Sequence, residues 1–235
     1  KFDKDSAGTL NLRKEGGHSE NRVVHHKDQT GQEIQRAISH QVHQKSNILV
    51  LDYHLAIDLI TENNHCLGAY VLDEKTNEIL TFQSDFTVLA TGGIGHLYGH
   101  TTNPVIATGD GIAMAYRSKA EVKEMEFIQF HPTVLYDATT GTSFLISEAV
   151  RGFGAKIKKK NGHRFMLDYD DRGDLASRDI VSQSIDIELK KSGDECVYLD
   201  CTHLEMEAFT KHFPMIYNHC KSVGIDLAKD WIPVV

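Results

Sequence analysis

The sequence predicts a mixed α/β fold, and three observations along its 235 residues support that prediction. A stretch that begins at Thr30 has apolar residues at helical spacing. The stretch from 48 to 90 consists instead of short runs rich in β-branched residues and separated by turn residues. Beyond Phe130 the composition becomes more helical and more charged. A chain of this length can form one large domain or two smaller ones.

The first expected helix follows Thr30 and is about 13 to 16 residues long. Its apolar stripe consists of Ile34, Ala37, Ile38 and Val42. Turn residues at Asn63-Asn64 and Thr76-Asn77 then separate short runs that are typical of a strand meander. The four expected strands of this part are Ile48–Leu51, Leu55–Thr61, Cys66–Leu72 and Glu78–Gln83.

Two glycine-containing segments follow the meander. Phe86–Ala90 is a continuous apolar run, which predicts a strand, and Thr91-Gly92-Gly93 ends it with residues that let the backbone approach a ligand closely. Thr108-Gly109-Asp110-Gly111 then precedes an expected helix at 112–116. The Asp110 carboxylate either complements the positive end of that helix or accepts a hydrogen bond from a bound cofactor, and the two interpretations are compatible.

The second half of the chain predicts three more helical stretches. One runs through Leu145–Val150, and a longer one extends from the N-cap Ser177 to about Lys191, with Gly193 after its last turn. Arg178 therefore starts a helix, where the dipole disfavours a cation, so its side chain either extends into solvent or lies near an anion. The third stretch begins with a capping box of Thr202 and Glu205 and is interrupted at Pro214.

Composition argues against several classes of function. The formal net charge of -8 disfavours nucleic-acid binding, and no apolar run approaches the roughly 20 residues that span a membrane. Four cysteines without a CxxC pair fit reduced thiols in a cytoplasmic protein. The 14 histidines include no HExxH motif, so no metal is expected.

Short polar motifs between the apolar segments predict a site for an anion. Glu148 and Arg151 lie three residues apart and share a helix face, where they form either a surface ion pair or, given the apolar residues 144–146 before them, a partly buried one. His131 precedes Pro132, which favours an extended backbone at the end of a segment and makes His131 a candidate site residue. Guanidinium, imidazole and hydroxyl groups together suit a small dicarboxylate.

The order of these motifs resembles that of a known flavoprotein family. EGGHS at 15–19, ATGG at 90–93, HTTNP at 100–104 followed by TGDG at 108–111, EFIQFHPT at 126–133, SEAVRG at 147–152 and SRD at 177–179 match it in sequence order. The family comprises succinate dehydrogenase, fumarate reductase and L-aspartate oxidase, and the chain is most similar to its aspartate oxidase branch. The resemblance spans nearly the whole chain.

The resemblance implies a partial Rossmann-like FAD-binding domain with the β-meander at 1–127, and a helical or mixed capping domain at 128–235 that closes over a dicarboxylate. The dinucleotide fingerprint GxGxxG is absent from the sequence, so the chain is expected to be a fragment. The resemblance also implies that FAD, bound without a covalent link, is contacted by four residues. They are Thr91, Gly92, Gly93 and Asp110.

The same resemblance assigns substrate and catalytic roles. His131 and Ser147 would bind substrate carboxylate, and Ser147 keeps the hydroxyl of the threonine that the family usually has there. Arg178 would be the catalytic arginine, with Glu148 and Arg151 as a proton relay toward it. Two departures are Phe153 in place of an acidic residue after the relay and Ser177 in place of a proline before the arginine.

Glu15 indicates the substrate within this family. Aspartate oxidases have a glutamate before the paired glycines, suited to the substrate ammonium, whereas the alternative for Glu15 is an exposed residue in a turn. The resemblance thus implies oxidation of L-aspartate to iminoaspartate with O2 or fumarate as acceptor. The product would feed quinolinate synthase and NAD formation in a bacterial cytoplasm.

Two alternatives remain open at the level of sequence. The chain could come from a succinate dehydrogenase or fumarate reductase flavoprotein subunit, which would need an iron-sulfur partner and often carries a covalent flavin. It could also be a non-catalytic domain that does not hold FAD.

Overall fold

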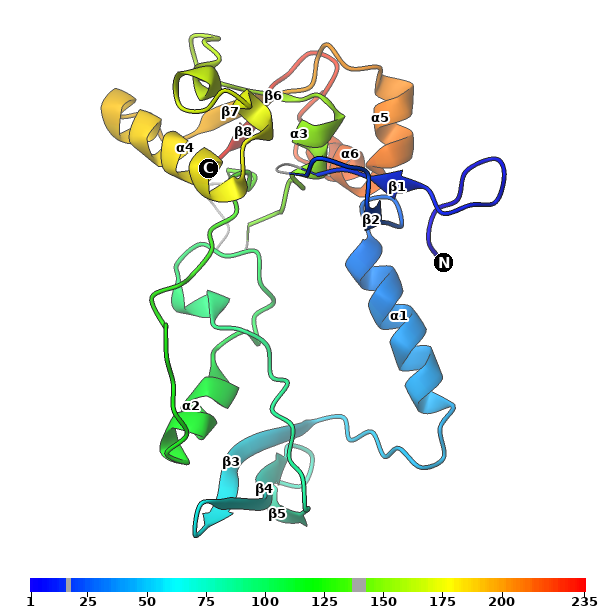
Figure 1. Cartoon of the computed structure of the whole chain (residues 1–235), viewed down its shortest axis with the longest axis vertical. Helices are drawn as coiled ribbons and strands as arrows, with labels where there is room; N and C mark the ends of the chain where they lie inside the picture. The colour runs from blue at the N-terminus through cyan, green and yellow to red at the C-terminus, as the bar shows by residue number, and fades with distance from the viewer. Residues whose placement is uncertain (16–17, 137–142) are drawn as a thin grey trace. The chain divides into compact units, whose positions relative to one another are not determined.

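The computed structural model describes residues 1–15, 18–136 and 143–235, so Gly16 and Gly17 of the EGGHS motif lie outside the described residues. Figure 1 shows the order of its helices and strands. The chain divides into two compact units, which are unit 1 (1–42 and 129–235) and unit 2 (43–128). The mixed α/β class predicted from the sequence is confirmed. The assignment of an FAD-binding domain to 1–127 and a capping domain to 128–235 stays a prediction.

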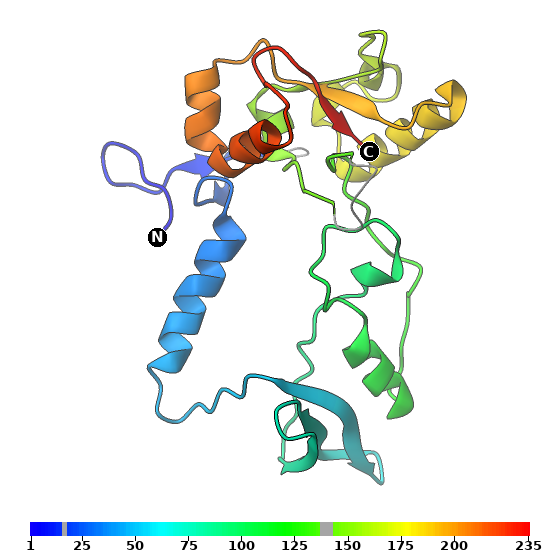
Figure 2. The same cartoon turned by 180° about the vertical axis from the view of Figure 1, so that it is seen from behind.

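Unit 1 contains two small antiparallel sheets. One pairs β1 (Leu12–Arg13) with β2 (Val23–Val24), and the other has the order β6 (Lys156–Lys158), β7 (Val197–Asp200), β8 (Ile232–Val234). Figures 1 and 2 both place the second sheet between α4 and the pair α5 and α6. The helices of this unit are α1 (Thr30–His43, which ends at the unit boundary), α3 (Ala149–Phe153), α4 (Arg178–Ser192), α5 (Met206–His212) and α6 (Pro214–Ser222). Two 3₁₀ helices, η2 (Phe165–Asp168) and η3 (Gly173–Leu175), complete it.

The hydrophobic core lies in unit 1. Strand alternation turns Ile157 of β6 and Val197 and Leu199 of β7 inward, where each is at most 2% exposed. Helical spacing adds Val181 and Ile185 of α4 to the same buried cluster. Aromatic rings then fill the space beneath α5 and α6, with the centroids of Phe209 and Phe213 5.1 Å apart and those of Phe153 and Phe213 5.5 Å apart.

Most helix predictions in unit 1 are confirmed. α1 begins at Thr30 and has 14 residues, and α4 follows Ser177 and ends at Gly193, whose φ of 74° is the left-handed conformation typical of a C-cap. α6 begins at Pro214, where the missing N–H costs nothing. Ser177 makes no side-chain hydrogen bond to the helix backbone, so its capping role rests on its extended conformation.

Two predictions in unit 1 were wrong in detail. The capping residue of α5 is Glu205 alone, whose carboxylate accepts from the N–H groups of Glu207 and Ala208, whereas the Thr202 hydroxyl donates to Asp200 at 2.7 Å. The helix expected through Leu145–Val150 begins only at Ala149. Residues 144–146 instead hydrogen bond with 133–135, through bonds that include Ile146 N–H to Thr133 O, and this ladder is incompatible with a helix.

Unit 2 contains the meander β3 (His54–Glu62), β4 (His65–Asp73) and β5 (Glu78–Gln83), which is antiparallel throughout, together with η1 (Gly95–Leu97) and α2 (Asp110–Arg117). Asn63 and Asn64 turn between β3 and β4 with positive φ, as their side chains tolerate. Arg117 of α2 donates to Asp58 at 2.8 Å and to the Ile57 carbonyl at 3.0 Å, which ties the helix to β3.

The strands predicted at 48–51 and 86–90 were wrong. Neither run pairs with another strand in the described part of the chain, and a strand needs a neighbour to take its hydrogen bonds. Phe86 is 90% exposed and Val88 86% exposed. Among the described residues of unit 2, the buried apolar side chains are Ala107 and Met114. None of the helices in the described chain is long and apolar enough to cross a membrane.

Candidate functional site

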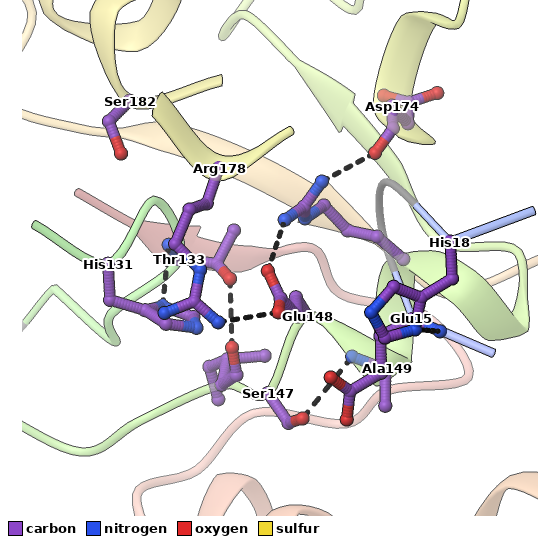
Figure 3. A network of polar contacts seen from close by, with 12 residues as sticks. Glu15, His18, His131, Thr133, Ser147, Glu148, Ala149, Asp174, Arg178 and Ser182 are labelled. Atoms are coloured by element: carbon purple, nitrogen blue, oxygen red, sulfur yellow. Dashed lines mark hydrogen bonds and ion pairs between the residues drawn. The ribbon is translucent and has the colours of Figure 1, made fainter. Parts of the chain in front are cut away.

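A network of charged side chains in unit 1 joins the start of α3 to the start of α4 (Figure 3). Glu148 precedes α3 and is 7% exposed, and its carboxylate lies between two arginines. Glu148 Oε1 accepts from Arg178 Nη2 at 2.6 Å, and Oε2 accepts from Arg151 Nη2 at 3.4 Å. One carboxylate thus bridges two guanidinium groups from different helices.

Arg151 is the buried end of this network. Its side chain has no exposed surface, and its Nη1 donates to the Asp174 carbonyl at 2.6 Å. Its Nε is buried and has no hydrogen-bond partner in the part of the chain that the structure describes. Burial lowers the pKa of Arg151, although Glu148 and Asp174 oppose that shift. The predicted pairing of Glu148 with Arg151 is therefore present, and it is buried.

Arg178 is the accessible end of the network. Its side chain is 36% exposed, and Nη1 donates to Gln129 Oε1 at 3.0 Å while Nη2 holds Glu148. Of the two possibilities that the sequence left open, the structure has Arg178 paired with an anion at the start of α4. A guanidinium has five N–H donors, so Arg178 retains donors for a second anion.

His131 and Ser147 are brought together by Thr133. The Thr133 hydroxyl donates to the Ile146 carbonyl at 2.8 Å, which fixes the segment of His131 beside that of Ser147. The Thr133 N–H donates to His131 Nδ1 at 3.2 Å, so the proton of a neutral imidazole is on Nε2. Burial lowers the pKa of His131 to about 4, with Glu148 opposing the shift. His131 is thus a neutral hydrogen-bond donor near pH 7.

Ser147 has its proton available for a ligand. Its Oγ accepts from the Ala149 N–H at 3.2 Å, which uses a lone pair and leaves the O–H as a donor. This contact belongs to the turn that starts α3.

Glu15 lies beside the same helix start. A Cβ on Gly152 of α3 would be 3.1 Å from the Lys14 carbonyl oxygen and 3.9 Å from Glu15 Cα, so glycine there allows the segment to approach. The Glu15 N–H donates to His18 Nδ1 at 3.4 Å, and the His18 N–H returns to the Glu15 carbonyl at 3.1 Å. Figure 3 shows Glu15 on the side of the network where Ser147 and Ala149 lie.

Three residues that take part in this network of contacts were not identified from the sequence. Gln129 and Thr133 orient Arg178 and His131, and Asp174 offers its backbone carbonyl to Arg151. Gln129 and Thr133 belong to the EFIQFHPT motif, which was a usable signal. The role of Asp174 had none, because any residue type carries a carbonyl.

In unit 2, the four residues assigned to the cofactor divide between a glycine segment and the start of α2. A Cβ on Gly111 would clash with the Thr91 hydroxyl, and one on Gly109 would lie 3.0 Å from Ile94, so the two segments pack through glycines. Gly92 has a φ of +78°, and neither Gly92 nor Gly93 has another group within 4 Å of a Cβ position. Asp110 is exposed in the first turn of α2 and accepts from the Thr108 hydroxyl at 2.9 Å.

This segment fits a large anionic cofactor such as FAD. Gly92 and Gly93 have no side chains, so the space beside their backbone is open. The carboxylate of Asp110 can accept a hydrogen bond from a cofactor hydroxyl. The described residues contain no group of three or more histidine, cysteine, aspartate or glutamate side chains suited to a metal ion.

Comparisons with known proteins show the family to which the chain is similar. The family model described as FAD binding domain matches residues 1–235. The chain is 46% identical to the chloroplastic L-aspartate oxidase of Oryza sativa subsp. japonica, covering 100% of the chain and 38% of that protein. It is 45% identical to L-aspartate oxidase of Vibrio cholerae, covering 95% of the chain and 43% of that protein. The chain thus spans about two fifths of the length of these relatives.

Solved flavoproteins share the fold. A quinol-fumarate reductase with menaquinol molecules matches with a TM-score of 0.91 and 30% identity, over 99% of this chain and 43% of that one. Mycobacterium smegmatis Sdh1 in complex with UQ1 matches with a TM-score of 0.69 and 31% identity, over 99% and 41%.

Proposed function

The chain belongs to the FAD binding domain family of the succinate dehydrogenase and fumarate reductase flavoproteins, and on that premise we propose that it serves FAD-dependent oxidation of L-aspartate to iminoaspartate. The observation that supports this most is the set of groups around Glu148 in unit 1. It combines donors for carboxylate oxygens with a carboxylate, Glu15, for an ammonium. Both charges of an amino dicarboxylate therefore have complementary partners.

Substrate carboxylates would be bound by three groups of different character. Arg178 contributes a fixed positive charge, and His131 and Ser147 contribute a neutral N–H and an O–H. Their positions depend on hydrogen bonds that Thr133 and Ala149 donate and that Gln129 accepts, so little freedom would be lost when substrate binds.

Arg178 also has the features of a proton carrier when supported by its neighbours. An isolated guanidinium has a pKa above about 12 and stays protonated. Here Glu148 touches both Arg178 and the buried Arg151, which forms a continuous chain of N–H···O contacts from the accessible guanidinium into the protein. We assign Arg178 the proton donated to carbon in the fumarate-reducing direction, with Glu148 and Arg151 restoring it.

FAD, bound without a covalent link, would accept the hydride that leaves C2 of aspartate. Thr91, Gly92, Gly93 and Asp110 would hold it. O2 or fumarate would take the electrons onward. We further propose that the iminoaspartate is used by a quinolinate synthase for NAD formation, and that the protein acts in the cytoplasm, although the plant relatives are named chloroplastic.

A second candidate is a succinate dehydrogenase or fumarate reductase flavoprotein subunit. The TM-score of 0.91 with a quinol-fumarate reductase favours it, because Arg178, His131 and Ser147 suit any four-carbon dicarboxylate. Glu15 separates the candidates, since a dicarboxylate without an ammonium has no use for a carboxylate there. Purification with an iron-sulfur subunit would support this second candidate.

The test uses the full-length protein and its flavin absorbance at roughly 450 nm. We expect aspartate to bleach this absorbance without added partner proteins. Glu15→Gln should slow aspartate-dependent bleaching roughly 10²-fold while leaving fumarate reduction within about twofold. Glu20→Gln, at an exposed position of the same segment, is the control. Equal loss of both activities in Glu15→Gln would contradict the ammonium-binding role of Glu15.

A further inference from the structure

A cavity of about 390 Å³ lies in unit 1, apart from the network around Glu148. The amino-terminal segment and β1 provide one part of its wall, and the end of α5 provides another. Four cations line it, which are Lys4, Arg13, Lys27 and Lys211. None of its lining residues holds a role in the substrate or cofactor assignments above.

The positive charge of this cavity is not balanced by its carboxylates. Its two acidic residues are Asp3 and Asp5, so the lining has twice as many cations as carboxylates. Asp5 Oδ1 is occupied by the N–H groups of Ala7 and Thr9, both at 2.9 Å. Among the described residues, no carboxylate forms an ion pair with any of the four cations.

Two histidines add polar groups to the wall. His25 is 4% exposed, its Nδ1 lies 3.1 Å from Asp3 Oδ2, and its Nε2 makes no hydrogen bond in the described structure. Buried polar atoms without partners are uncommon in folded proteins. Burial and the charge of Arg13 lower the pKa of His25, while Asp3 opposes that shift.

Arg13 is held in place for ligand binding. Its Nη2 donates to His212 Nδ1 at 2.5 Å, which places the proton of the neutral His212 ring on Nε2 and makes that atom a donor. Its guanidinium carbon lies 5.5 Å from the centroid of the Phe213 ring, where the cation and the ring attract each other. These contacts use neutral partners, and burial lowers the pKa of Arg13 while the nearby carboxylates of Asp3 and Asp28 oppose that shift without forming an ion pair with it.

We propose that this cavity binds a phosphate group, either as inorganic phosphate or as the phosphate of a small monoester. Arginine and lysine side chains without a carboxylate ion pair, such as those around this cavity, are the groups that bind phosphate oxygens most strongly. Several cations together favour an anion with two charges over one with a single charge. A volume of about 390 Å³ leaves room for a small organic part beside the phosphate.

Calorimetric titration of the full-length, FAD-loaded protein tests this proposal. The probes are inorganic phosphate and glycerol phosphate, each titrated with saturating succinate present to occupy the proposed substrate groups, at pH 7 and low salt, because screening weakens such binding. We expect saturable binding of phosphate or of the monoester. Arg13→Gln should weaken it roughly tenfold, and Lys211→Gln by about threefold to fivefold. Lys221→Gln, an exposed lysine of α6 that does not line the cavity, should leave it unchanged.

Tighter binding of glycerol phosphate than of inorganic phosphate would identify the monoester as the ligand class, and the reverse order would identify the free ion. If Arg13→Gln does not fold, the double variant Lys27→Gln with Lys211→Gln serves in its place. Absence of saturable phosphate or monoester binding in the presence of succinate, or equal affinity in all variants, would overturn the proposal. Aspartate-dependent flavin bleaching should stay unchanged in Lys211→Gln, so failure here is separate from failure of the proposed oxidase activity.

Discussion

The two units of the chain differ in how they are held together. Unit 1 has one continuous cluster of buried apolar residues between Leu135 and Val234. In unit 2, the described residues bury only Ala107 and Met114 as apolar side chains, while Phe86, Val88 and Ile106 are each at least 76% exposed. Each fully buried large apolar side chain contributes about 1.5 to 3 kcal/mol, so the hydrophobic term of unit 1 is much the larger.

This difference has a consequence for the two proposed sites. The substrate groups are attached to segments that the core of unit 1 orders, since Val150 of α3 and Val181 of α4 are fully buried. Their hydrogen bonds therefore have a fixed geometry. The glycine segment of unit 2 is positioned mainly by contacts of Thr91 and Ile94 with α2. Regions with few buried contacts open at lower free energy, so within this 235-residue chain the glycine segment should be the more easily disturbed.

Arg178→Ala should have the largest effect, and it should fall on activity rather than on stability. Removing the guanidinium eliminates the group that we propose binds carboxylate and stabilises developing charge, which predicts a loss of kcat/KM of roughly 10³-fold or more. The core beneath α4 is untouched, so the thermal midpoint of the full-length protein should move little. Arg172→Ala is the control, because Arg172 is exposed and pairs with Asp170 outside the network. If the thermal midpoint of Arg178→Ala fell together with its activity, the main role of Arg178 would be to stabilise the fold.

Phe209→Ala in unit 1 and Phe86→Ala in unit 2 test the comparison directly. Phe209 has no exposed surface and packs on Phe153 and Phe213, so its truncation should lower the free energy of unfolding by about 3 to 5 kcal/mol. Phe86 is 90% exposed, and its truncation should change that free energy by less than about 0.5 kcal/mol. Chemical denaturation of the 235-residue chain measures both. Similar losses from the two variants would refute the difference in packing between the units.

Local signals in the sequence predicted the elements that depend on local interactions. The stripe after Thr30, the cap pair of Ser177 and Gly193, and the turn residues of the meander all act within a few positions along the chain. The strand predicted at 86–90 and the first part, 145–148, of the helix predicted through Leu145–Val150 failed for a different reason. Strand formation depends on a distant partner, and the second segment has one, since Thr133 and Ile146 bond each other.

The same distinction holds for the candidate site. The pairing of Glu148 with Arg151 followed from helical spacing. That Glu148 also holds Arg178, 30 residues away, was expected only from resemblance to a family. The neutral state of His131 could not be derived from sequence, because it results from burial that the folded chain creates.

The stability of unit 1 should depend on pH through His131. Burial lowers its pKa to about 4 from 6.5, so between these values the unfolded chain binds a proton that the folded chain does not. Its contribution is therefore complete above pH 6.5 and declines as the pH falls toward 4. Between pH 7.5 and 5.0 the free energy of unfolding should fall by about 2 kcal/mol more in the unmodified protein than in His131→Gln. His65→Gln, at an exposed position of unit 2, should keep the full pH dependence, and an unchanged pH dependence in His131→Gln would contradict the buried state of that ring.

Gly93→Ala should have the smallest effect, and it separates the cofactor role of unit 2 from its packing. No group lies within 4 Å of a Cβ at Gly93 or at Gly99, so alanine at either position should leave the thermal midpoint of the FAD-free protein unchanged. If the segment at 91–93 approaches FAD, a methyl group at Gly93 would obstruct it and weaken FAD binding by about tenfold, or 1.4 kcal/mol. Gly99→Ala should retain normal affinity. Flavin fluorescence during titration of the FAD-free full-length protein measures both constants, and equal affinities would place the cofactor away from Gly93.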